Sequence, residues 1–536
     1  MPNTLLALPV LAMTAMLGFA QSVQNEVAIL GDKEPENQGA NTNPTGSLTG
    51  NNLACSNPDV NAVDVLIYLP QRSKNCVRLA GGFSNVPGSY AGLSYIANNF
   101  LHLGEVLSVN GEFSVRRRRV SLDFAKTSLF GESIESGFSV YGQRFSYNQA
   151  RESSILAFQR DLPQFDAFGP DNLLKYVSYS YGTSAFVRYR LRNVYRIGLT
   201  YAYDVSDITM LTSLTSDYFS YLSFDNLSAP HQLNGIHTSK LTPSLSYNTV
   251  DSDVRPTRGM AAVISTGIAG LGGNVKTVEP AIEAKYFHSG LKKKHVIGVH
   301  VRAQMIRGYG DDVAPAFDRF YAGGEDEIRG FESWSITPIA YQPGVGAFNV
   351  LNADGTPRLQ KTIDANGDVH IVNVQQNLPI YRPASIGGDT KVVTNVEYRI
   401  PIGGPLTLAL FYDAGVNRAT FRDQIRLDPR IINALNSTFP EAAFTDHPIV
   451  EPATQKVRMS TGAEIQFLPR RIHVPLRFYA AYNPLIYRNA LHPPIVVSRS
   501  DFPNEATAQA VLNELQAPVP LRERRFMFRF SIGRTF

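Results

Sequence analysis

The stretch Tyr195-Arg-Ile-Gly-Leu-Thr-Tyr-Ala-Tyr-Asp-Val205 decides the fold of this chain. Tyrosine and aliphatic side chains alternate there with polar or small ones, among them Arg196 and Asp204. A period of two over eleven residues is the length that a tilted strand needs to cross a bilayer. The stretch therefore predicts one strand of a transmembrane β-barrel, with lipid on one face and a watery lumen on the other.

The same alternation recurs at residues 297–305, 392–400 and 457–465. The polar face of these segments carries ionised groups in mid-strand, such as Arg302 and Glu397. A soluble sandwich would hide its apolar face in a core and would show this pattern on shorter strands. The repeated pattern therefore favours a barrel with a water-filled interior.

The spacing of the expected strands adds a second argument. Short connections, such as 192–194 and 403–405, alternate with long ones, such as 308–390. Outer-membrane barrels have short periplasmic turns and long extracellular loops. We expect an all-β, antiparallel transmembrane barrel of about sixteen strands, with long extracellular loops and a short periplasmic N-terminal segment. On this count the basic run Arg116–Arg119 forms a solvated extracellular hairpin tip.

The composition argues against several other classes of protein. A net charge of +4 is small for 536 residues and gives no reason to expect a nucleic-acid partner. The sequence has no Gly-x-Ser-x-Gly, His-Glu-x-x-His or Cys-x-x-Cys motif and no phosphate loop. We therefore expect no enzymatic activity, no cofactor and no metal site.

The N-terminal region precedes the alternating pattern. An apolar run from Leu5 to Ala20 ends in small residues, which predicts a secretory signal peptide at 1–20. No Lys or Arg precedes this run, so a misassigned start is the alternative. Residues 21–76 are expected to form a periplasmic linker and 77–536 the barrel. Cys55 and Cys76 either form a disulfide or remain two free thiols.

The chain ends in a strongly amphipathic segment, Phe526-Met-Phe-Arg-Phe-Ser-Ile-Gly-Arg-Thr-Phe536. Phe528 and Phe530 share one face, and Phe536 closes the chain. The segment resembles the C-terminal signal by which outer-membrane proteins are recognised for assembly.

Three further stretches resemble the BamA-type superfamily of outer-membrane assembly and two-partner secretion barrels, which includes the bacterial surface antigens. They are residues 244–259, which end in Pro-Thr-Arg-Gly, residues 320–331, which contain Gly-Gly and Ile-Arg-Gly-Phe, and residues 395–401 followed by 408–415. With the last strand, the resemblance covers residues 62–536, that is, the barrel part of the family. Residues 62–69 resemble the strand that closes the last POTRA module of such proteins.

The resemblance implies a lock between an extracellular loop and the barrel wall. In the family, the arginine of the second stretch folds back into the lumen and meets acidic wall residues. Carried over by position, Arg329, which is followed by Gly330 and Phe331, would pair with Glu397 and Asp413. Strand parity independently turns both acids toward the lumen.

Glycines are expected to shape this loop. Gly323, Gly324 and Gly330 suit tight backbone turns in the inserted loop, and the alternative is that they are ordinary loop glycines.

The mechanism that the resemblance implies is strand templating at a lateral seam. The first strand contains Gly81-Gly82 and the last contains Gly533, and glycines weaken pairing. A weak seam between these strands would let an unfolded client barrel add its own strand. The expected partners are therefore the bilayer with its lipopolysaccharide, unfolded client barrels and periplasmic accessory lipoproteins, and the expected location is the bacterial outer membrane.

Two other functions stay open at this point. A two-partner secretion pore would carry POTRA modules and a plug helix, and a porin or surface antigen would not need the Arg329 loop. Residues 21–61 are too few for a POTRA module. The chain would then be a truncated product, one part of a split protein, or a barrel-only relative.

Overall fold

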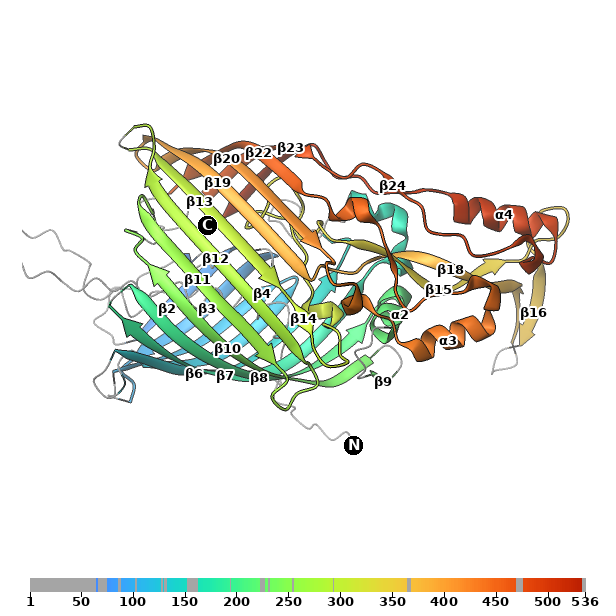
Figure 1. Cartoon of the computed structure of the whole chain (residues 1–536), viewed down its shortest axis with the longest axis horizontal. Coiled ribbons are helices and arrows are strands. Elements are labelled where there is room, and N and C mark those ends of the chain that lie inside the picture. The colour runs from blue at the N-terminus through green and yellow to red at the C-terminus, as the bar shows by residue number, and fades with distance from the viewer. Residues whose placement is uncertain are drawn as a thin grey trace, which may run out of the picture.

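The computed structural model describes residues 64–65, 75–84, 88–101, 104–126, 129, 133–151, 162–192, 194–221, 227–229, 232–252, 255–292, 294–363, 368–468 and 476–532. In this part of the chain, one antiparallel sheet curls into a barrel (Figure 1). Its sixteen long strands are β2 (Asn75–Ser84), β3 (Gly88–Asn98), β4 (Glu105–Ser114), β5 (Arg117–Lys126), β6 (Ile134–Asn148), β7 (Lys175–Leu191), β8 (Tyr195–Met210), β10 (Gln232–Asn248), β11 (Gly259–Ala269), β12 (Thr277–Ser289), β13 (Val296–Met305), β19 (Thr390–Gly403), β20 (Leu406–Arg418), β22 (Arg458–Phe467), β23 (Leu476–Leu485) and β26 (Phe526–Ile532).

Neighbouring long strands are consecutive along the chain, as in an up-and-down barrel. Three short strands extend the same sheet: β1 (Asp64–Val65), β9 (Leu227–Ala229) and β14 (Arg307–Gly308). The expected fold class is thus confirmed. The first long strand begins at Asn75, two residues before the expected barrel boundary.

Alternation of side chains explains why these segments form the wall. In β8, Ile197 and Leu199 are exposed on the outer face, whereas Gly198 and Thr200 face inward. On the last strand, the side chain of Phe528 is 78% exposed, and lipid would cover such a surface. The lumen holds the buried charges instead, and the period-two prediction is therefore confirmed.

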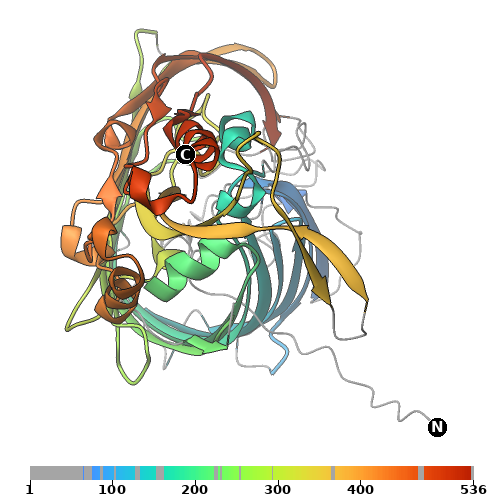
Figure 2. The same cartoon turned by 90° about the vertical axis from the view of Figure 1, so that its right-hand side faces the viewer.

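The two ends of the barrel differ. The connections that follow β6, β8, β13, β20 and β23 are long, and they lie together over one mouth (Figure 2). Their α-helices are α2 (Ser213–Tyr221), α3 (Pro429–Thr438) and α4 (Glu505–Gln516), and their 3-10 helices are η2 (Pro163–Phe168), η3 (Pro170–Asn172), η4 (Ala316–Asp318), η5 (Arg422–Ile425), η6 (Pro440–Ala442), η7 (Pro452–Gln455) and η8 (Arg499–Asp501). Among the described residues, none of the helices is long and apolar enough to cross a membrane.

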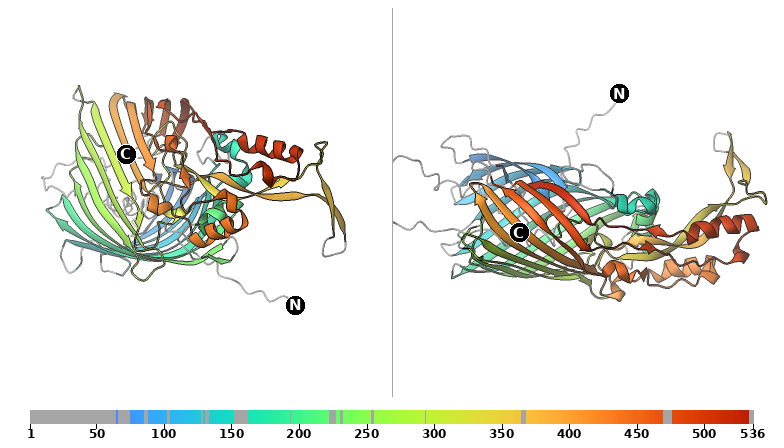
Figure 3. Two further views of the ribbon diagram at one scale, coloured as in Figure 1. Left: turned by 45° about the vertical axis from the view of Figure 1, so that its right-hand side comes forward. Right: turned by 90° about the horizontal axis from the view of Figure 1, so that it is seen from above.

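The longest connection, between β13 and β19, both enters the barrel and projects from it. Its outer part is a ladder of β15 (Ile339–Asn349) and β18 (Gln375–Ser385), to which β21 (Ile449–Val450) adds. Between them, β16 (Leu359–Ile363) and β17 (Val369–Asn373) form a hairpin that points away from the barrel (Figure 3). A further short pair, β24 (Ala490–Leu491) and β25 (Val519–Pro520), lies in the last connection.

The sequence predicts a solvated extracellular hairpin tip at Arg116–Arg119, but the structure buries the first residue of this tip. Arg116 is buried, and its guanidinium carbon lies 4.3 Å from the ring centroid of Trp334. Trp334 belongs to the long connection that enters the barrel. The tip therefore packs against this connection, because a cation over an indole face is favourable.

The first and last long strands meet with little pairing. β26 has seven described residues and pairs with β23, from Leu476↔Ile532 to Tyr482↔Phe526. β2 pairs with β3 along one edge and with β1 on the other, at Asp64↔Ala80 and Val65↔Leu79. β2 and β26 are neighbours, but no ladder joins them within the described residues. We call this junction the seam.

Several predictions fall on residues outside those described. They are the signal peptide at 1–20, nearly all of the linker, Cys55, Gly533 and Phe536. Cys76 lies in β2, where its side chain is not described. The proposed disulfide and the domain boundary of the linker therefore stay predictions.

Candidate functional site: an arginine locked in the barrel lumen

The site is built on residues 320–336 of the long connection, which we call the inner loop. Isolated bridges Phe320↔Gly388 and Ala322↔Ile336 fix its two branches inside the barrel. Almost every residue of the inner loop is buried. A buried loop needs partners for its backbone groups, and side chains of the wall supply them. Asn417 donates to the carbonyl oxygens of Phe320 and Ile336 at 2.7 and 3.0 Å.

Three glycines of the inner loop have positive φ angles. Gly323, Gly324 and Gly330 have φ angles of 105°, 100° and 86°, which L side chains rarely adopt. At Gly330 the space is closed as well, since a Cβ would lie 2.3 Å from Oδ1 of Asn483. Asn483 in turn donates to the Gly330 carbonyl at 2.6 Å. Gly330 thus allows the loop to approach β23 more closely than any other residue would.

Arg329 is the centre of the site, and its side chain is 0% exposed. Its Nε and Nη2 donate to the two carboxylate oxygens of Asp413 at 2.8 Å each. Its Nη1 donates to Oε1 of Glu397 at 2.6 Å. The structure therefore brings together the three residues that the sequence paired. A bidentate fork of this kind is specific to arginine, because lysine presents a single point charge.

Further contacts hold the same guanidinium from its other sides. Nη1 also reaches Oε2 of Glu464 at 3.3 Å, and the backbone N–H of Arg329 donates to Asp413 at 3.0 Å. The guanidinium carbon lies 3.8 Å from the ring centroid of Phe411. Burial alone would lower the pKa of Arg329, but Asp413 and Glu397 outweigh it and raise the pKa well above its usual value.

The acids also pair with further arginines of the wall, Arg399 on the same strand as Glu397 and Arg477 on β23 next to Glu464. Glu397 accepts from Nε of Arg399 at 2.7 Å, and Glu464 accepts from Nε and Nη2 of Arg477 at 2.9 and 2.7 Å. Three carboxylates are thus matched by three guanidinium groups in a buried network. We refer to Arg329, Glu397, Asp413, Glu464 and Arg477 as the lock.

Sequence reasoning missed Glu464 and Arg477. A signal for Glu464 existed, because it lies on the polar face of the predicted strand 457–465. Parity gives the face of a strand but not the height along the barrel. It therefore could not tell that Glu464 reaches the same guanidinium as Glu397 and Asp413.

Contacts made by Glu327, two residues before Arg329, support the lock. Lys391 on β19 binds Oε1 of Glu327 at 2.5 Å, and both side chains are buried. Asn395 donates to the Glu327 carbonyl at 2.6 Å and to Asp413 at 2.9 Å. The backbone before Arg329 is therefore held by the same strand that supplies Glu397.

Phe331 plays a different part from that of Arg329. It is buried in a small apolar cluster that also contains Ala322, Ile328, Ile336 and Val393. Burial of such a ring contributes about 1.5–3 kcal/mol. Phe331 thus fixes the tip of the inner loop by apolar packing, next to the ionic lock.

The far side of the inner loop reaches the last strand. Arg529 of β26 donates to Glu332, and its Nε lies 3.6 Å from Oε1 of Glu325. All three side chains are buried or nearly so. The inner loop is therefore tied both to the lock wall and to one strand of the seam.

The predicted seam and end residues take the following places. Gly81 and Gly82 lie in β2, opposite Ala91 and Tyr90 of β3, and not in a ladder with β26. Phe528 points outward from β26, and the ring of Phe530 lies 4.7 Å from that of Phe478. The position of Gly533 and Phe536 relative to the seam stays a prediction.

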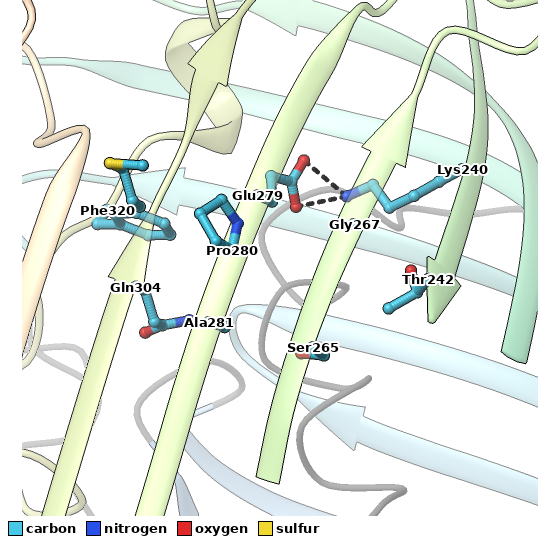
Figure 4. A pocket seen from close by; sticks show the side chains of 10 residues that line it. Lys240, Thr242, Ser265, Gly267, Glu279, Pro280, Ala281, Gln304 and Phe320 are labelled. Atoms are coloured by element: carbon cyan, nitrogen blue, oxygen red, sulfur yellow. Dashed lines mark hydrogen bonds and ion pairs between the residues drawn. The ribbon is translucent and has the colours of Figure 1, made fainter. Parts of the chain in front are cut away.

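Another buried ion pair lies apart from the lock, on the lumen wall (Figure 4). Nζ of Lys240 on β10 donates to both carboxylate oxygens of Glu279 on β12, at 2.8 and 2.7 Å. Gly267 of β11 lies between them, and a Cβ there would be 3.3 Å from Lys240. This small residue lets the pair span the intervening strand.

Comparison with known proteins places this geometry in a family. Residues 99–536 match the model of the Omp85 superfamily domain. The outer membrane protein assembly factor BamA of Neorickettsia risticii (strain Illinois) is 24% identical over 281 residues, which are 51% of this chain and 32% of that protein. The chain thus spans about a third of the length of this curated relative.

One solved structure agrees with this chain in its fold. The crystal structure of BamA from Haemophilus ducreyi lacking POTRA domains 1–3 matches with a TM-score of 0.54 and 17% identity, over 86% of this chain and 71% of that chain. CdiB from Acinetobacter baumannii matches with a TM-score of 0.43 and 10% identity, over 85% of this chain and 59% of that chain. The family comprises assembly or translocation barrels that are not enzymes and lie in the bacterial outer membrane. The chain, whose family model covers most of its length, belongs to the Omp85 superfamily.

Proposed function

We propose that this protein is an outer-membrane assembly factor that folds and inserts client β-barrels through the seam between β2 and β26. The observation that carries the proposal is the edge of β2 that faces away from β3. Within the described residues it has no ladder with β26 and pairs instead with β1, at Leu79 and Ala80. This edge therefore accepts an added strand, which is the step that insertion of a client requires.

The shape of the barrel supports the same mechanism. A closed barrel removes its unpaired edges, and an unpaired edge invites another strand. Within the described residues β2 and β26 share no ladder, so no ladder hydrogen bonds between these residues oppose opening. Gly81 and Gly82 leave β2 without side-chain packing at two successive positions.

The lock gives the proposed insertase a fixed wall against which the seam moves. Arg329 holds the inner loop to β19, β20 and β22, and Arg529 joins the same loop to β26. Unfolded client barrels are the proposed substrates. The bilayer with its lipopolysaccharide and periplasmic lipoproteins are the proposed partners, and a signal peptide at 1–20 would export the chain.

The experiment that tests the proposal closes the seam with a disulfide. Cys55 and Cys76 are replaced by Ser, and Ala80→Cys is combined in turn with Phe528→Cys, Arg529→Cys and Phe530→Cys. We expect the pair that cross-links to abolish insertion of other barrels when this protein is the sole copy. Reduction of the bond should restore insertion.

The matched control cross-links a junction that already carries a full ladder, with Val299→Cys and Val396→Cys, which are partners in β13 and β19. This bond should leave insertion unchanged. Insertion that continues through a fully cross-linked seam would exclude the proposed route and leave a translocation pore or a surface barrel as the function.

A further inference from the structure

A large cavity lies where the inner loop meets the beginning of β26. It has a volume of about 790 Å³, within the usual range for a ligand site. Gly330, Phe331 and Glu332 line it on one side, and Phe526 and Met527 of the seam strand line it on another. It therefore opens at the extracellular end of the seam, the end that carries the long loops.

Arginines dominate the lining of this cavity. They are Arg488, Arg522, Arg524 and Arg525, and we call them the arginine cluster. Two of the three acids in the lining are already neutralised from outside the cluster. Glu523 pairs with Arg458 at 2.8 Å, and Glu332 pairs with Arg529. Asp166 on η2 is the third acid, so the cluster carries a clear excess of positive charge.

Most of these arginines have unused donors. Within the described residues, Arg488, Arg522 and Arg525 make no ion pair, and Nη1 of Arg524, whose side chain is 43% exposed, lies 3.6 Å from Oε1 of Glu332. Several guanidinium groups around one cavity repel one another unless an anion lies between them. Planar guanidinium forks also suit the tetrahedral oxygens of a phosphate group.

An apolar, lipid-facing surface begins directly below the cluster. Phe526 is 64% exposed, and its ring lies 5.0 Å from that of Tyr482, which also faces outward. Phe528 continues this surface toward the membrane core. Aromatic side chains gather at the interface between bilayer and water in outer-membrane barrels. Positive charge above and an aromatic surface below fit an amphiphile with an anionic head.

We infer that the arginine cluster binds the phosphate groups of an anionic glycolipid of the outer leaflet, with its acyl chains along Phe526 and Phe528. The site would hold a lipid at the outer end of the seam. An acidic peptide would satisfy the cluster but has no use for the aromatic surface, which favours the lipid. The inference does not depend on the insertase proposal, because lipid binding can be measured without any client.

The test measures binding of bisphosphorylated lipid A to the purified full chain in detergent. Replacing Arg488, Arg522 and Arg525 together by Gln should weaken binding by roughly tenfold or more, since charge-assisted hydrogen bonds are lost. The control removes the same charge at the opposite end of the barrel, with Arg192→Gln, Lys292→Gln and Lys294→Gln. These three side chains are exposed in short turns, and their loss should leave binding unchanged.

Comparison ligands identify the source of the phosphate. Dephosphorylated lipid A should bind the unaltered chain as weakly as bisphosphorylated lipid A binds the triple variant. Inorganic phosphate that binds as tightly as lipid A, or an acidic peptide that displaces lipid A, would overturn the inference, as would an equal loss in the control variant. If the triple variant unfolds at a lower temperature than the control, Arg522→Gln and Arg525→Gln are tested singly, and unchanged binding in both would overturn it too.

Discussion

Two adjoining parts of this barrel wall, the lock wall and the seam, are built in opposite ways. On the lock wall, β19 and β20 pair over nearly their whole length, and buried carboxylates from β19, β20 and β22 converge on Arg329. At the seam, β2 and β26 adjoin without a ladder among the described residues. The stability of the barrel wall is therefore unevenly distributed, and it is greater in the lock wall than at the seam. The buried charge lies in β19, β20, β22 and β23, the successive strands that lead up to β26 at the seam.

A physical reason connects the two regions. A buried ionic network tolerates few arrangements, because a misplaced charge in a dry environment is costly. It therefore fixes the inner loop in one position. The inner loop then presents Glu332 and Glu325 to Arg529 on the seam strand. The rigidly held inner loop thus holds β26, which is one edge of the weakly paired seam.

The largest effect is expected from Arg329→Ala, which removes the centre of the lock. The change leaves Glu397, Asp413 and Glu464 buried without their shared cation. We expect unfolding in detergent to become easier by about 3–5 kcal/mol. Denaturant titration followed by a shift in gel mobility measures this.

The control for this change is Arg499→Ala, which breaks an exposed pair with Glu505. Surface changes of this kind usually stay within about 0.5 kcal/mol. Equal losses in the two variants would mean that the lock wall is no more stable than the surface.

A smaller effect is expected from Gly330→Ala. The new Cβ would meet Asn483 at 2.3 Å, in a backbone with φ of 86°. Strain and overpacking together should cost about 1–3 kcal/mol. Gly355→Ala has a similar φ of 81° with open space around it, so the difference between the variants isolates the close approach to β23. Equal losses of stability in the two variants would show that backbone strain alone, without the close approach to β23, explains the need for glycine at position 330.

The tie between the inner loop and the seam is tested by Arg529→Gln. Loss of the contacts with Glu332 and Glu325 should cost about 1.5–3 kcal/mol locally. Amide hydrogen exchange should accelerate in β26 and stay unchanged in β19.

Arg524→Gln is the matched control, because Arg524 contacts the same Glu332 at 3.6 Å, but with a side chain that is more exposed than that of Arg529. Its effect on exchange in β26 should be small. If exchange speeds up equally in β19 and β26, then the inner loop does not act on the seam through Arg529.

The smallest effect is expected from replacing Gly81 and Gly82 by Ala. Each substitution should favour the extended backbone of β2 by about 0.5–1 kcal/mol. Hydrogen exchange in β2 should slow, and insertion of client barrels should slow with it. Gly403→Ala, at the end of β19 with nothing within 4 Å, serves as the control at a strand far from the seam. If hydrogen exchange in β2 stays unchanged, Gly81 and Gly82 do not contribute to the weakness of the seam.

The sequence by itself determined the barrel and the face on which the side chains of its strands lie. Period two turns Glu397 and Asp413 inward whatever the rest of the chain does, because successive side chains of a strand point to opposite faces. The pairing with Arg329 came from the resemblance of residues 320–331, and the structure brings these three residues together.

Only the tertiary structure decided which inward residues meet. Glu464 joins Arg329, Arg116 packs on Trp334, and Arg529 reaches Glu332 across large separations in sequence. Alternation fixes the side of the wall on which a residue lies but leaves its height along the barrel open. That height depends on the stagger between strands and on the path of the inner loop, which the closed barrel as a whole imposes.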